Sequence, residues 1–327
     1  MRVAVLLLGY AAALGLLGPT WLARASWCSR APRLAVWGWQ TLSTTVVLSV
    51  ALAGLAVAVP TMPLSGSLAN LLRACVMALR AQYAAPGGAA VAASGTMLAL
   101  VLLGRIGWCA GAALVRARRD RSRHAAVLSM VGRHRSDLGI TVLEDDRPAA
   151  YCLPGRGHRI VLTTAALAAL EPDARDAVIA HERAHIRQRH HLVLAYGEAL
   201  ERAFPRLSLF RTAADETRRL VEMAADDEAA ARSGALPLAG ALVALAGAGA
   251  PTASLAASGG HVAGRVRRLL GPQRPLHRAV VWSGVLVAAA VIALPLVLVA
   301  EPAVAATGMN ACPLSDSPVA EVVQTAS

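Results

Sequence analysis

The stretch His181-Glu182-Arg183-Ala184-His185 decides how this chain is interpreted, because it places two histidines four residues apart in a strongly helical region. Positions four apart lie on one face of an α-helix, so both imidazoles can reach the same metal ion. Glu182 lies next to this pair, close enough to hold a water molecule bound to that metal. The spacing therefore predicts a metal site with His181 and His185 as ligands.

The helix that carries these residues has recognisable ends. Pro172 suits the first helical position, and Asp173 and Asp176 add negative charge to the opening turn. Val178 shares a stripe with the two histidines, so we expect the imidazoles to point into the domain interior. Basic residues that complement the helix dipole gather toward the predicted end, namely Arg187, Arg189, His190 and His191. His190 is rotated off the ligand face, and we expect it to be a surface or capping group.

A catalytic zinc ion usually has three protein ligands and one open position, so a further ligand is needed. The next acidic helix, predicted over residues 215–232, offers Glu222 and Asp226 one turn apart on one face. We predict that Glu222 is a ligand and that Asp226 braces a ligand imidazole from behind. Other carboxylates in this region are alternative ligands or surface charges, namely Glu198, Glu201, Asp227 and Glu228.

The composition is too apolar for an ordinary soluble domain, with 56% hydrophobic residues, 16% charged residues and a mean hydropathy of +0.52. Four stretches reach the length of about 20 apolar residues that a bilayer core requires. They run from Val3 to about Gly18, from Leu34 to Val59, from Ala89 to between Gly104 and Val115, and from Ala279 to Ala300. We interpret the first as a retained span, because Arg24 follows where a signal-peptide cleavage site would need small residues.

Arginine clusters favour one orientation of these spans, with both termini outside the cell. In this arrangement residues 1–115 hold three spans, residues 116–278 form a cytosolic domain, residues 279–300 form the fourth span, and residues 301–327 form a short extracytoplasmic tail. Arg105 interrupts the third span, and we place it near the interface, where its side chain can snorkel.

The net charge of +12 does not require a nucleic-acid partner. The densest arginine clusters flank the spans, where anionic lipid headgroups attract them, and no basic strip is interleaved with aromatic residues. We therefore expect the lipid bilayer as a partner and no direct nucleic-acid binding. All 32 basic residues are arginine, which together with many alanines is typical of a GC-rich bacterial genome and indicates a bacterial plasma membrane.

The five cysteines are scattered and predict no disulfide framework.

The segment between the third and fourth spans is long enough to bury a core of its own. A basic helix continuous with the third span is expected from Arg116 to about Arg135. Short β-branched runs predict strands at residues 140–143, 149–153 and 158–164. These strands would form a small sheet beside the helix that carries the two histidines.

Two strings and their placement between spans resemble the BlaR/MecR family. The strings are VIAHERAHIR at residues 178–187 and LVEMAAD at residues 220–226, and the similarity covers about residues 140–270 together with the four-span layout. Members of that family are integral-membrane zinc metallopeptidases of the gluzincin type, related to the HtpX and CAAX prenyl proteases. The resemblance implies an α-helical membrane protein with a cytosolic α+β zincin-like metalloprotease domain.

The resemblance also implies roles for individual residues. His181, His185 and Glu222 would hold one Zn²⁺ per chain, and Glu182 would be the catalytic base of peptide-bond hydrolysis. The strand at residues 149–153 can accept substrate as an added edge strand. His261 or Tyr151 can donate to the transition state, although we favour an ordinary structural role for both.

The chain departs from the antibiotic-sensing members, which carry a penicillin-binding domain after the last span. The tail after residue 300 holds no S-x-x-K motif, so we expect no acylation by β-lactams. Charged residues and a proline interrupt residues 192–214, which favours the BlaR-like arrangement over the HtpX-like one with further spans.

Three functions remain open on the sequence alone. We favour a membrane metalloendopeptidase that cleaves a cytosolic regulator, such as a transcriptional repressor, in response to a signal. The alternatives are an HtpX-like protease for quality control of membrane proteins and a non-enzymatic signalling scaffold with a structural metal site.

Overall fold

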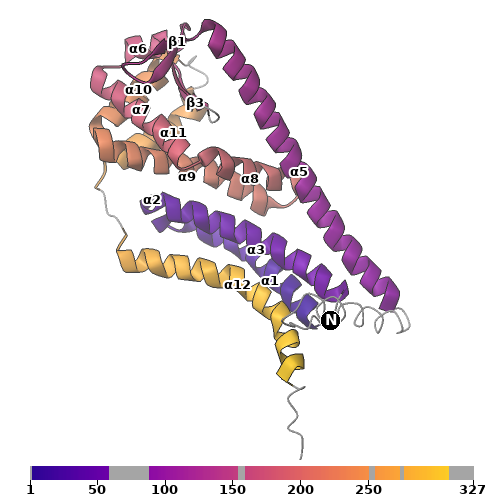
Figure 1. The fold of residues 1–327 in the computed structure, drawn as a ribbon. Coiled ribbons are helices and arrows are strands. Elements are labelled where there is room, and N and C mark those ends of the chain that lie inside the picture. The colour runs from indigo at the N-terminus through magenta and orange to yellow at the C-terminus, as the bar shows by residue number, and fades with distance from the viewer. Residues whose placement is uncertain (1, 59–87, 154–158, 250–254, 273–275, 309–327) are drawn as a thin grey trace, which may run out of the picture.

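The computed structural model describes residues 2–58, 88–153, 159–249, 255–272 and 276–308. This part of the chain is mostly helical and contains one small mixed sheet (Figure 1). The sheet and the helices around α7 lie at one end of the long helix α5, and the other long helices extend away from them beside its opposite half.

Four helices of the described chain are long and apolar enough to cross a membrane. They are α1 (Arg2–Arg24), α3 (Pro32–Ala58), α5 (Gly88–Val131) and α12 (Arg278–Gly308). Each contains one of the four predicted stretches, except that Val59 at the end of the second lies outside the described residues. The first helix continues past the predicted end near Gly18 as far as Arg24. These four helices support association with a membrane.

The third apolar stretch and the basic segment after it form the single helix α5, as their continuity predicts. The predicted helix end near Arg135 is wrong, because α5 ends at Val131 and residues 133–135 form a strand. Gly132 makes this change of direction possible. A Cβ at this position would lie 2.6 Å from the Leu128 carbonyl oxygen and 2.6 Å from a methyl carbon of Thr141.

The sheet has four strands in the order β1-β2-β4-β3. Their bounds are Arg133–Arg135 for β1, Ile140–Leu143 for β2, Ala150–Leu153 for β3 and Arg159–Thr163 for β4. The parallel pair is β2 and β4, whereas β1 and β3 run antiparallel to their neighbours. The three predicted strands are confirmed to within one residue at each described end. Ile140, Ile160 and Leu162 form a core with Ile179 of α7, so the sheet packs against the helix that carries the two histidines.

Seven further helices are described. They are α2 (Trp27–Arg30), α6 (Thr164–Ala169), α7 (Pro172–Arg187), α8 (His190–Ala203), α9 (Ser208–Ser233), α10 (Ala235–Gly249) and α11 (Leu255–Leu270). The predicted start of α7 at Pro172 is confirmed. His190 and His191 begin α8 instead of ending α7, because Arg189 adopts a left-handed conformation with φ of 52° and breaks the helix.

The hairpin of α8 and α9 packs directly on α3. Phe210 of α9 shares a buried core with Leu42 and Val46 of α3, and at the other end of the contact Arg33 pairs with Glu228 at 2.9 Å. On the far side, the guanidinium of Arg105 in α5 donates to a carbonyl oxygen at the end of α8. Arg105 is exposed but has this hydrogen-bond partner within the protein, and such a bond offsets part of the cost of a guanidinium in a membrane span.

Candidate metal centre

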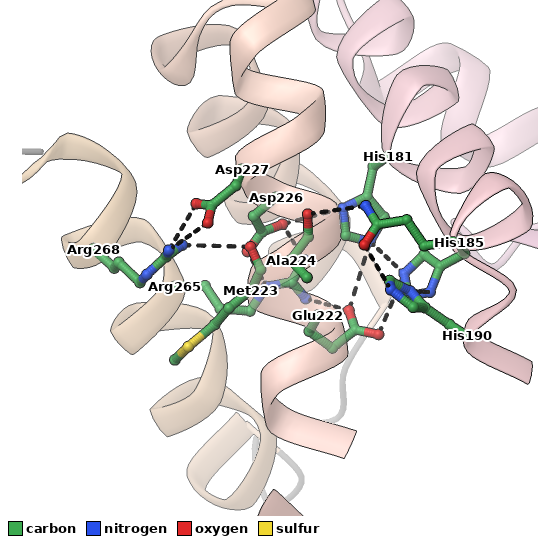
Figure 2. Close-up of polar contacts among 11 residues, drawn as sticks. His181, His185, His190, Glu222, Met223, Ala224, Asp226, Asp227, Arg265 and Arg268 are labelled. Atoms are coloured by element: carbon green, nitrogen blue, oxygen red, sulfur yellow. Dashed lines mark hydrogen bonds and ion pairs between the residues drawn. The ribbon is translucent and has the colours of Figure 1, made fainter. Parts of the chain in front are cut away.

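His181 and His185 lie one turn apart on α7 and direct the same ring atom toward one point (Figure 2). Their Nε2 atoms are 3.0 Å apart, and His181 is only 7% exposed. Two imidazoles that bind one tetrahedral zinc ion through bonds of about 2.0–2.1 Å have nitrogens about 3.3 Å apart. The pair is therefore arranged as two ligands of one ion.

Glu222 reaches the same point from α9. Its Oε1 lies 3.4 Å from His185 Nε2, and its Oε2 lies 3.6 Å from His181 Nε2. One ligand atom from each of the three residues lies within 4.8 Å of the others. Two imidazole nitrogens and one carboxylate oxygen are a donor set that zinc accepts, and they leave a coordination position for water. The side chains present thus fit a catalytic zinc ion.

Asp226 lies behind the first histidine, one turn after Glu222. Its Oδ1 is 3.1 Å from His181 Nδ1, although the ring is rotated out of hydrogen-bond geometry, and Asp226 is fully buried. A carboxylate on this side of the ring favours the tautomer with a proton on Nδ1. That tautomer leaves Nε2 of His181 free to bind metal.

Arg265 of α11 completes this side of the site, and sequence reasoning missed it. It binds both carboxylate oxygens of Asp226, at 2.6 Å and 2.8 Å, and its Nη1 lies 3.0 Å from Glu222 Oε2. A fully buried carboxylate needs a positive partner, but the burial of Asp226 is known only from the structure. Arg265 therefore holds the two carboxylates of α9 in place.

His190 was predicted to be a surface or capping group, and the structure contradicts this. It is 5% exposed, its Nδ1 lies 2.9 Å from His185 Nδ1, and its Nε2 lies 3.2 Å from Gln188 Oε1. The prediction assumed one continuous helix, whereas the left-handed Arg189 turns the start of α8 back toward α7. If His190 donates from Nε2 to Gln188, its Nδ1 accepts from His185, whose Nε2 then remains free for metal.

This arrangement predicts a measurable role for His190 in metal binding. Replacing His190 with Ala removes the acceptor for His185 Nδ1 and should lower zinc affinity about tenfold, at the lower end of the usual effect of a supporting residue. Competition with a chromogenic chelator measures the change. The variant His134→Ala, at an exposed position on β1, is the matched control and should bind zinc as the unaltered protein does. Equal affinity in His190→Ala would contradict the role.

The charges of the site stabilise one another in the metal-free protein. Burial opposes ionisation of His181, but the carboxylates of Asp226 and Glu222 outweigh it and raise the pKa of His181 to about 9. Burial also opposes the charge of Glu222, but His181 and Arg265 outweigh it and lower the pKa of Glu222 to about 2. Burial and the charge of His181 lower the pKa of His185 to about 4, so its ring is neutral at pH 7. Metal binding must therefore displace a proton from this cluster.

Glu182 is half-buried beside the ligands. Burial raises the pKa of its carboxyl group, and the thiol of Cys152 on β3 hydrogen-bonds with it. Burial and the neighbouring charge of Glu182 raise the pKa of Cys152 to about 12, so this thiol stays protonated. A carboxylate with a raised pKa is better matched to proton transfer near neutral pH than an exposed one.

The alternative carboxylates are engaged in ion pairs elsewhere. Glu198 pairs with Arg202, Glu201 with Arg218, Asp227 with Arg268, and Glu228 with Arg33 and Arg187. Tyr151 lies half-buried on β3, and His261 is exposed on α11, one turn before Arg265. In the part of the chain that the structure describes, neither makes a hydrogen bond or ion pair with the three candidate ligands. Arg265, and not His261, is the α11 side chain that reaches them.

A metal bound by residues of both α7 and α9 should raise the thermal stability of the protein. At a free zinc concentration one hundred times the dissociation constant, the gain in unfolding free energy is about 2.7 kcal/mol. Differential scanning fluorimetry of chelator-treated protein, before and after zinc is added, measures the shift. The variant Glu222→Gln should show a smaller shift at the same zinc concentration, and an equal shift would indicate a metal bound elsewhere.

Comparison with known proteins adds one finding. Residues 115–226 match the family model described as Peptidase family M48, a segment that contains the two histidines, Glu182, Glu222 and Asp226 and ends before Arg265. No curated protein and no solved structure matches the chain. M48 peptidases are typically zinc-dependent, in agreement with the His-His-Glu group described above. The match supports the M48 metallopeptidase family for this chain, and hence a peptidase activity.

Proposed function

We propose that this protein is a membrane-embedded zinc metalloendopeptidase. The observation that carries the proposal is the convergence of His181, His185 and Glu222, with Glu182 beside them, inside the segment that matches the M48 family. The four long apolar helices support the membrane location. We place the metal centre on the cytosolic side of a bacterial plasma membrane, with both termini outside.

Each polar side chain of the site has a distinct role in the proposed reaction. His181, His185 and Glu222 would hold the zinc ion, which when bound lowers the pKa of its water and polarises the scissile carbonyl. Glu182 takes up the proton of the attacking water and passes it to the departing amine. Asp226 and Arg265 hold His181 and Glu222 in position.

The edge strand β3 is the proposed substrate-binding element. It lies at one end of the strand order and pairs with β4 alone among the described strands, so an extended peptide could pair with its other edge. Cys152 of β3 contacts Glu182, which places this edge beside the proposed base. A peptide added to β3 would therefore pass close to the metal ligands.

Two substrate classes fit this site. The BlaR-like resemblance favours a cytosolic regulator such as a transcriptional repressor. The docking of α9 on α3 favours membrane proteins as the second candidate, because it ties the metal centre to an apolar helix. Val46, which shares a buried apolar core with the α8–α9 hairpin, lies about 21 Å along α3 from Pro32 at 1.5 Å per residue.

A comparison of new protein N-termini distinguishes these classes. Cells that express the full chain are compared with cells that express Glu182→Gln, and the N-termini unique to the first are identified by mass spectrometry. One or a few cuts in a soluble regulator support regulated proteolysis, whereas many cuts in membrane proteins support quality control. If the two cell types show the same N-termini, the peptidase proposal fails and a structural metal site is favoured.

A further inference from the structure

A groove lies between α12 and the pair formed by α1 and α3. Its volume is about 460 Å³, which lies within the range of roughly 300–1,000 Å³ typical of small-molecule sites. Apolar side chains from all three helices line it, among them Leu14, Leu42 and Val287. The groove is a different site from the metal centre, since none of the candidate metal ligands lines it.

The three helices come together at one end of the groove and leave it open at the other. Tyr10 of α1 donates to the carbonyl of Val291 in α12 at 3.0 Å, and beyond this bond Leu7, Ala53 and Val299 pack in one apolar cluster. In the opposite direction α12 diverges from α1 and α3 toward its own start (Figure 1). The open end therefore lies where α1 ends and where α3 and α12 begin.

The open end carries positive charge and tryptophan. Arg30 lines the groove there together with Trp21 and Trp27, and Arg24 and Arg278 stand at the adjoining helix ends. Arg30 is exposed and has no ion-pair partner within the described ranges. Tryptophan is enriched at the headgroup level of membranes, and clustered arginines there attract anionic lipids.

We propose that this groove binds one anionic phospholipid, with an acyl chain between α12 and the α1–α3 pair and its phosphate at Arg30. The apolar walls complement the hydrocarbon chain, and the unpaired guanidinium complements the negative headgroup. The proposal rests on the membrane placement of the four long helices and is independent of peptidase activity.

The charge at the open end of the groove favours a phospholipid over an apolar helix of another protein, because the lipid brings a negative phosphate to Arg30.

Native mass spectrometry of the full chain in detergent tests the proposal directly. The purified protein is titrated with phosphatidylglycerol or with zwitterionic phosphatidylcholine, and bound lipid is counted per chain. We expect one phosphatidylglycerol to be retained in preference to phosphatidylcholine. Arg30→Gln should weaken phosphatidylglycerol binding about fivefold. Arg24→Gln removes the same charge at the adjoining end of α1 but outside the groove lining, and should leave binding unchanged.

A second pair of variants tests the hydrocarbon part of the site. Ala288 lines the groove, whereas the neighbouring Ala289 is exposed and does not. Ala288→Trp should fill the groove and abolish retention of the lipid, while Ala289→Trp should retain it. Zinc content and helical circular dichroism check that each variant is folded. If Ala288→Trp does not fold, Arg30→Gln still tests the site, because it alters only an exposed side chain.

Three results would overturn the proposal. Equal retention of phosphatidylcholine and phosphatidylglycerol would exclude recognition of an anionic headgroup. Unchanged phosphatidylglycerol binding in folded Ala288→Trp or in Arg30→Gln would place the lipid elsewhere. An apolar segment of a partner protein that occupies the groove and excludes lipid would identify a different ligand.

Discussion

Replacing Glu182 with Gln is expected to lower kcat/KM for peptide cleavage by about 10²- to 10⁴-fold, the usual contribution of a general base. The amide keeps the shape of the side chain but cannot accept the proton of the attacking water. Zinc content should remain that of the unaltered protein, because Glu182 is not among the three candidate ligands. Cleavage of a fluorogenic peptide library by the purified full chain measures the rate, and atomic absorption measures the metal.

The combination of lost activity and retained metal separates a catalytic base from a structural residue. Glu198→Gln is the matched control, because this carboxylate is half-exposed and pairs with Arg202 on the surface of α8. The control should cleave as fast as the unaltered protein. If Glu182→Gln and the control cleave equally well, Glu182 is not the base.

Replacing Glu222 with Gln should lower zinc affinity more than any other substitution considered. A supporting residue typically changes metal affinity by about 10- to 100-fold, and the loss of a direct ligand should exceed that range. Asp226→Asn, which alters a residue behind His181, should fall within it. Zinc titration against a chelator of known affinity compares the two variants. Peptide cleavage at low zinc concentration should decline in the same order.

Asp227→Asn is the control for these two variants. Asp227 follows Asp226 on α9, but its carboxylate binds Arg268 and not the histidines. Its substitution should leave zinc affinity unchanged. If Glu222→Gln retained zinc as firmly as Asp227→Asn, the ligand set of two histidines and one glutamate would be wrong.

Much of the local structure follows from short-range patterns in the sequence. Pro172 and the acidic first turn define the start of α7, and its apolar stripe orients the two histidines inward. β-branched runs identify β2 and β4, and long apolar stretches identify the four long helices. These features depend on neighbours within one or two turns, and such neighbours can be read directly from the chain.

The features that sequence reasoning missed depend on contacts between distant residues. Arg265 lies 39 positions after Asp226, and no local pattern shows which of the 32 arginines would bind that carboxylate. His190 reaches His185 because Arg189 adopts a left-handed conformation, which is uncommon for a residue other than glycine. The core shared by α3 and α9 depends on side-chain packing between segments about 170 residues apart.

The coordination of zinc in the full chain is the most direct test of the central claim. X-ray absorption spectroscopy of the zinc-loaded protein should show two imidazole nitrogens and light oxygen ligands at about 2.0–2.2 Å, with no sulfur. In Glu222→Gln the same measurement should show the two imidazoles with an altered oxygen shell. A spectrum with a thiolate ligand, or one that is identical in the two proteins, would contradict the proposed site.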